Sequence, residues 1–133
     1  MFPKPLAAAF LFCAIALPAT AGAASPQGRW LAEDINGGGV IDRLQTTLEL
    51  GADGKVTGMG GCNRYMGSAT VTDSAISFRP MASTRKACSP AVMDQENKFH
   101  AALTTVASWR IEQTKLLLLD KDGIELMRLS KQD

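Results

Sequence analysis

Short alternating segments separated by turn signals constrain this chain most strongly. Residues 46–50 and 55–59 alternate apolar and polar side chains on either side of Asp53 and Gly54. Asp-Gly between two such runs favours a β-hairpin, and repetition of this pattern is typical of an antiparallel β domain. The segments that we predict as strands are 30–35, 46–50, 55–59, 64–72, 75–81, 108–113, 115–119 and 124–129.

One segment between these strands has helical periodicity. Ser89 is suited to cap a helix, and Pro90 is suited to its first position. The residues that recur on one face are Val92, Glu96, Phe99, Leu103 and Val106. We therefore predict a helix over 90–106. The expected fold class is α+β, with a mainly antiparallel, curled or barrel-like sheet of about seven or eight strands and one helix packed on it.

The N-terminus has the features of a secretory signal peptide. Lys4 precedes an unbroken apolar run over 6–17, which is shorter than the roughly 20 residues that a membrane span needs. Small residues follow, so cleavage after Ala21 or after Ala23 fits equally well. We predict a signal peptide over 1–23 and a periplasmic or secreted mature protein without a membrane span.

The mature chain should then consist of a flexible leader over 24–28 and one domain over 29–133. A lipoprotein would need Cys13 as its acylated residue, and bulky Phe12 directly before it argues against that. Without Lys4, 13 basic residues balance 13 acidic ones. A neutral chain offers no electrostatic footprint for nucleic acid or anionic lipid.

Cysteine content follows from the predicted compartment. If Cys13 leaves with the signal peptide, Cys62 and Cys88 remain, and two thiols in an oxidising space most simply form one bridge. The alternatives are two reactive thiols or a pair of metal ligands, for which the neighbouring sequence offers no supporting residues. We expect a structural disulfide.

The sequence offers little for catalysis. His100 is the only histidine and has no recognisable partner, so we interpret it as a surface or interface residue and expect no catalytic residues. Zinc or iron would need several His or Cys ligands at motif spacing, so we expect no metal and no cofactor. The glycine-rich run 58–63 lacks the lysine of a phosphate loop and is interpreted as a backbone feature beside the disulfide.

Glu96 shares a face with the apolar stripe, and a buried carboxylate is costly unless it is paired. If Cys62 bonds Cys88, Arg64 lies near the helix start, and we predict that it pairs with Glu96 as a structural anchor rather than an acid–base group.

The order of these motifs resembles the META domain family, the group of HslJ-like proteins. The resemblance covers about 28–128. Its motif residues, in chain order, are Trp30, Leu31, Gly58, Gly60, Gly61, Cys62, Asn63, Arg64, Tyr65, Gly67, Thr84, Arg85, Ala87, Cys88, Glu96, Phe99, Leu103, Leu116, Leu118, Asp120 and Gly123. One departure is Lys86, where the family often has methionine.

The resemblance implies a small β-rich domain of the envelope, linked to stress or antibiotic tolerance, with no established reaction and no catalytic residues to carry over. It also implies a fold similar to that of lipid-binding pilotins. We therefore expect a non-enzymatic, monomeric domain that binds an envelope protein or a lipid-like ligand. The alternative is a secreted inhibitor of a protease or other hydrolase, acting through the loop 79–89.

Overall fold

The structure is a computed structural model that describes residues 2, 3, 5, 9 and 24–133. Apart from those first four positions, the predicted signal peptide lies outside the described residues. Residues 24–133 form nine strands and one helix. These are β1 (Gly28–Ile35), β2 (Thr47–Leu50), β3 (Lys55–Met59), β4 (Arg64–Thr72), β5 (Ala75–Phe78), β6 (Ala82–Ser83), α1 (Pro90–Leu103), β7 (Ser108–Glu112), β8 (Lys115–Leu119) and β9 (Glu125–Gln132).

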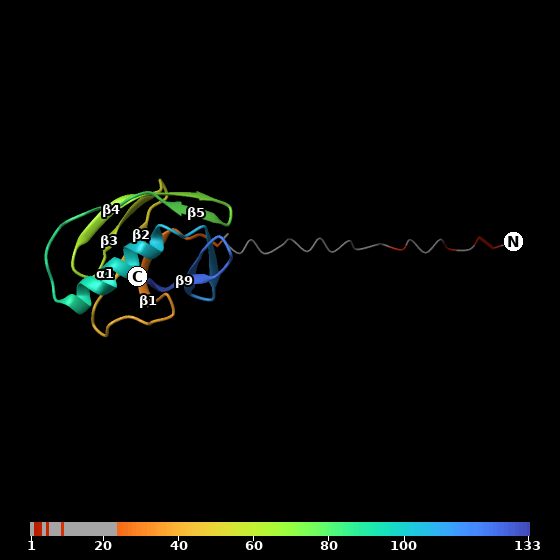
Figure 1. The fold of residues 1–133 in the computed structure, drawn as a ribbon. Helices are drawn as coiled ribbons and strands as arrows, with labels where there is room; N and C mark the ends of the chain where they lie inside the picture. Colours follow the sequence, from red (N-terminus) through yellow and green to blue (C-terminus); the bar gives the residue numbers. More distant parts are fainter. Residues whose placement is uncertain (1, 4, 6–8, 10–23) are drawn as a thin grey trace.

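The strands form one antiparallel sheet that closes on itself as a ring. Its order is β3-β2-β1-β9-β8-β7-β5-β4-β6, and an additional pairing of β3 with β4 completes the ring. Figure 1 shows α1 lying across this curled sheet. The predicted α+β class with a curled antiparallel sheet and one helix is therefore confirmed.

The segment that we predicted as one strand, 75–81, ends early at Phe78, and the ninth strand, β6, lies just beyond the predicted segment. The chain leaves the ladder after Phe78 and returns to pair Ala82 and Ser83 with β4. Pro80 lies in this interruption, and proline has no N–H to donate to a ladder. The predicted strand is therefore shortened to β5, and β6 is an additional short strand that we did not predict and that also pairs with β4.

Apolar side chains from the sheet and from α1 fill the ring. The fully buried members include Leu48 and Val56 on one side, Leu116 and Leu118 on the other, and Phe99 from the helix. Alternation in the strands points these side chains to one face, as the sequence pattern predicted. Burial of this apolar surface is the main term that stabilises the fold.

The helix begins at Pro90, as predicted, but Ser89 at its N-cap makes no side-chain capping bond. It ends at Leu103, three residues before the predicted end. The amides of Thr104 and Thr105 turn back to carbonyl groups three residues earlier, which tightens the last turn. Val106 still reaches the core with 6% exposure.

Candidate functional site

The ladder between β2 and β3 opens beside the glycine-rich run. Two residue pairs form this ladder, and beyond them the Thr47 side chain accepts a hydrogen bond from the Met59 amide (3.0 Å). The Tyr65 hydroxyl donates to the Thr47 carbonyl (2.6 Å). A Cβ atom at Gly58 would lie 2.3 Å from that carbonyl oxygen and 2.7 Å from the hydroxyl. Only glycine leaves room for this crossing.

The chain then makes a tight turn over residues 60–63, which we call the turn. Glu96 of α1 is only 4% exposed and holds the turn. Its Oε1 accepts from the amides of Cys62 (3.0 Å) and Asn63 (2.5 Å), and its Oε2 accepts from Asn63 Nδ2 (2.8 Å). A Cβ at Gly60 would lie 2.8 Å from Glu96 Cγ, so glycine is required here as well.

The predicted pair between Glu96 and Arg64 is wrong. Arg64 is exposed, and no ion pair joins these two side chains within the described part of the chain. Because Arg64 starts β4, its neighbour Tyr65 points inward and Arg64 itself points outward. Amide donors therefore satisfy the carboxylate in place of the guanidinium.

These donors also set the ionisation of Glu96. Burial raises the pKa of this carboxyl group, but the hydrogen bonds from Asn63 and Cys62, together with His100 nearby, outweigh burial and lower its pKa. Glu96 is thus held as a carboxylate, and its accepting capacity is used inside the protein.

Asn63 uses all of its side-chain hydrogen-bonding capacity. Its Nδ2 donates to Glu96 and to the Lys86 carbonyl (3.1 Å), and its Oδ1 accepts from the Thr84 hydroxyl (2.9 Å) and the Lys86 amide (2.7 Å). Two donors and two acceptors match the full inventory of a carboxamide. Asn63 therefore joins the turn, the helix and the segment before the helix.

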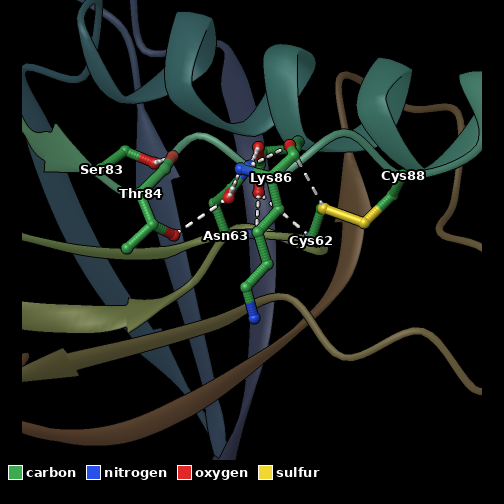
Figure 2. The surroundings of a disulfide bond; sticks show 7 residues. Cys62, Asn63, Ser83, Thr84, Lys86 and Cys88 are labelled. Atoms are coloured by element: carbon green, nitrogen blue, oxygen red, sulfur yellow. Dashed lines mark hydrogen bonds between the residues drawn. A yellow bond between two sulfur atoms is a disulfide. The ribbon is translucent and has the colours of Figure 1, made fainter.

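That segment, residues 82–89, is called the strap. Figure 2 shows it running past the turn, with Thr84 and Lys86 facing Asn63. A disulfide between Cys62 and Cys88 ties the turn to the end of the strap, with the two Cα atoms 6.0 Å apart. The turn, α1 and the strap, which we call the junction, thus form one connected unit.

The junction contains a second chain of polar contacts, which we did not predict from the sequence. Gln95 is 6% exposed, donates to the Thr46 hydroxyl (2.9 Å) and accepts from the Ile41 amide (2.7 Å). Thr46 in turn donates to the Gly60 carbonyl (3.0 Å). A polar residue beside Glu96 on the inner face of a helix was the available signal.

We interpreted His100 as a surface or interface residue, and the structure shows that part of its ring is covered. It is half-buried, with its ring edge-on to Tyr65 (5.1 Å between centroids) and Phe99 (5.3 Å). Its Nε2 is buried without a hydrogen-bond partner among the described residues. Burial lowers the pKa of His100, although Glu96 opposes this, so the ring is held neutral. Burial and the Glu49 charge raise the pKa of Tyr65, which keeps its hydroxyl protonated.

The polar groups of the junction are thus arranged to hold the chain together. In the described part of the molecule, no cluster of three or more His, Cys, Asp or Glu side chains could hold a metal ion. Nor is any described helix long and apolar enough to cross a membrane.

Comparison with known proteins gives a family and a fold. A family model described as META domain matches residues 23–133. None of the curated proteins matches the chain.

Three solved structures are similar in fold. An NMR structure of a protein from Burkholderia xenovorans has a TM-score of 0.65 at 24% identity, covering 80% of this chain and 82% of that one. Another NMR structure has a TM-score of 0.62 at 20% identity, with coverage of 79% and 89%. A crystal structure of a DUF4847 family protein from Bacteroides vulgatus ATCC 8482 has a TM-score of 0.56 at 17% identity, with coverage of 80% and 95%.

Proposed function

Since the chain belongs to the META domain family, we propose that it is a non-enzymatic binding domain that acts outside the cytoplasm and engages a protein partner through the strap. One observation carries this proposal. The strap is exposed at every residue, yet hydrogen bonds and a disulfide fix its backbone to the core. A segment that is ordered before binding loses less conformational freedom on association, which favours recognition.

The polar residues of the motif support a non-enzymatic role. A catalytic acid, base or nucleophile must reach a substrate. Glu96 and Asn63 are buried, and their hydrogen-bonding atoms face one another or the backbone. These side chains hold the binding segment in place.

An extracytoplasmic location is supported by the disulfide, because such bridges persist in oxidising compartments. It is also supported by the signal peptide that the sequence predicts. Family resemblance further suggests a role in envelope stress tolerance. Deletion of the gene should then sensitise the cell to heat or envelope-active antibiotics, and a variant without a functional strap should fail to restore tolerance.

A protein partner is better supported than an acyl chain. The interior of the ring is filled by packed side chains. A hollow of about 440 Å³ beside β1–β4 has three charged residues in its lining, the ion pair of Arg29 with Glu49 (2.7 Å) and Arg64, together with polar and apolar residues. Desolvating such charges costs free energy that an acyl chain cannot offset by pairing with them.

Site-specific photo-cross-linking in an exporting host tests the proposal. A photoreactive residue at exposed Ser83 should give a discrete protein adduct, whereas the same residue at exposed Lys121, in a remote turn, should not. Replacing Arg85 and Lys86 by Glu should abolish the Ser83 adduct. Equal labelling from both positions, or none from the strap, would contradict the proposal.

A second candidate function, inhibition of a hydrolase, is favoured by the same fixed strap. From the sequence we placed the inhibitory segment at 79–89. The later part of this segment is exposed, and the Cys62–Cys88 disulfide fixes its end.

A further inference from the structure

The strap is held on both sides of one residue. Before that residue, Ala82 and Ser83 pair with β4, and the Thr84 amide donates to the Arg64 carbonyl (3.0 Å). After it, Asn63 binds both the amide and the carbonyl of Lys86, and Cys88 is tied to Cys62. The backbone around this position is thus fixed while its outer side stays open.

The residue between these anchors is Arg85. It is exposed, and neither its amide nor its carbonyl bonds to any described residue. The Thr84 hydroxyl and the Lys86 amide meet on the same oxygen of Asn63, which lies beneath the Arg85–Lys86 peptide bond. The hydrogen bonds and the disulfide that hold the strap therefore involve the neighbours of Arg85 and not Arg85 itself.

We infer that the strap presents the Arg85–Lys86 bond, in the manner of a substrate, to a serine protease with an acidic specificity pocket, and thereby inhibits that protease. This inference rests on the proposed function and names its partner class. A fixed, exposed segment suits such a target because protease–inhibitor complexes form with little backbone movement. An exposed arginine suits it because the pocket of trypsin-like enzymes carries a carboxylate.

The local charge agrees with this partner. Arg79, Arg85 and Lys86 lie within or just before the strap, and no acidic residue occurs between positions 79 and 93. None of the three forms an ion pair within the described part of the molecule. Their charges are therefore free for an acidic binding surface, which raises the rate of encounter.

The sheet edge agrees as well. β6 is the last strand in the sheet order and pairs only with β4 among the described strands. Ala82 and Ser83 are both exposed, and an extended segment of the protease would pair with their backbone just before Arg85. Backbone pairing at that position would align the following carbonyl with the protease nucleophile.

The tethers explain inhibition rather than cleavage. Attack by the protease serine forms an ester with the Arg85 carbonyl carbon, breaks the bond to Lys86, and passes the serine proton to the Lys86 nitrogen. Asn63 keeps that nitrogen in place, and the Cys62–Cys88 disulfide joins the two halves of the chain. The amine can therefore attack the ester again, restoring the peptide bond and the serine.

Inhibition of trypsin with a chromogenic arginyl substrate tests the inference. The purified protein should inhibit with a dissociation constant of about 1 µM or tighter. Chymotrypsin and elastase, whose pockets are apolar or small, should not be inhibited. Absence of trypsin inhibition at micromolar excess of folded protein would overturn the inference.

Substitutions of Arg85 test whether this residue is responsible for trypsin inhibition. Arg85→Ala should weaken inhibition by at least about 30-fold, because a side chain that fills a specificity pocket is a binding hot spot. Arg85→Lys should stay within about tenfold of the wild type, since it keeps the charge. The matched control Arg110→Ala, an exposed arginine of β7 outside the strap, should change inhibition less than about twofold. An Arg85→Ala variant that inhibits like the wild type would refute the assignment.

Mass spectrometry locates the bond. Prolonged incubation with catalytic amounts of trypsin should add one water, with the product remaining a single mass until reduction. Reduction should then release two chains, one ending at Arg85 and one beginning at Lys86. Rapid cleavage elsewhere, with no slow step at this bond, would overturn the inference. If trypsin is not inhibited but the Ser83 adduct still forms, the proposed function stands and only the partner class fails.

Discussion

Two sides of the ring are built on different principles. The side formed by β1, β9, β8 and β7 is an extended ladder, in which β7 and β8 pair over five residues and β1 and β9 over six, with one register shift in the β1–β9 pairing and one in the β8–β9 pairing. On the junction side β3 and β4 still pair over five residues, but the β2–β3 ladder stops after two residue pairs and the chain leaves the sheet at the turn.

The difference teaches where polar side chains are needed. In the ladder the backbone groups pair with one another, so inward positions such as Leu116, Leu118 and Met127 are apolar. At the junction the backbone leaves the sheet, and side chains must satisfy its buried amides and carbonyls. Glu96, Asn63 and Gln95 do so, which explains why the motif residues gather there.

The largest expected effect comes from removing the carboxylate at the junction. Glu96→Ala leaves three buried donors on Cys62 and Asn63 without an acceptor, and should lower the free energy of unfolding by about 4 kcal/mol. Urea denaturation followed by circular dichroism measures this. The control Asp94→Ala breaks only an exposed pair with Lys98 and should cost less than about 0.5 kcal/mol. Equal free energies of unfolding for the two variants would show that the buried hydrogen bonds of Glu96 add no more stability than an exposed ion pair.

Removing the disulfide should have a slightly smaller effect. The bridge spans 26 positions, and the chain-entropy model assigns such a loop about 3.5 kcal/mol. The Cys62→Ala, Cys88→Ala double variant should therefore unfold at lower urea concentration, and amide exchange should speed up first in the strap. A uniform rise in exchange over the ladder as well would show that the junction is not a separate unit.

A cavity in the ladder side should behave differently. Leu118 is fully buried in β8, and Leu118→Ala should cost about 3 kcal/mol through lost contacts and an unfilled volume. Because the backbone pairing stays intact, exchange should rise by global unfolding without selective opening of the strap. The control Ile124→Ala changes a residue that is 61% exposed and should be close to neutral.

The smallest effect is the response to acid, which should also arise at the junction. The folded-state pKa of His100 is lowered below 6.5, so its contribution to stability is present above pH 6.5 and lost as pH falls through the folded value. The same sign holds for Glu96, whose contribution is lost below pH 4.5. As pH is lowered, His100→Gln should reduce the decline in the urea midpoint that begins below pH 6.5. Glu96→Gln should reduce the further decline below pH 4.5. If both variants have the same pH dependence of the urea midpoint as the wild type, groups other than His100 and Glu96 cause the loss of stability in acid.

Much of the fold could be predicted from local pattern. β3, β4 and β8 match their predicted bounds, and the helix begins at Pro90 as expected. These elements are set by alternation, helical spacing and turn residues, which act over a few positions. The early end of β5 was missed although Pro80 was a signal for it. The pairing of Ala82 and Ser83 with β4 could not be predicted, because a two-residue strand has no periodicity of its own.

The site was predicted in its residues but not in its contacts. The sequence indicated Gly61, Asn63, Tyr65, Glu96 and the two cysteines, and placed Glu96 on the inner face of the helix. Charge alone suggested Arg64 as its partner. Strand alternation turns Arg64 outward once Tyr65 is buried, so the pairing depends on a register that only the folded sheet supplies.

The sequence by itself therefore determined the class of fold, eight of the nine described strands, the helix and the pair of cysteines, because hydrophobic periodicity and turn chemistry are local properties. Only the tertiary structure decided that all side-chain hydrogen bonds of Asn63 go to the helix and the strap. It also decided that the Arg85 backbone, which lies between the bonded strap residues, bonds to no other residue in the described part of the chain. The bonds of Asn63 join residues more than twenty positions apart, and their partners are chosen by which backbone groups the closed ring leaves unpaired.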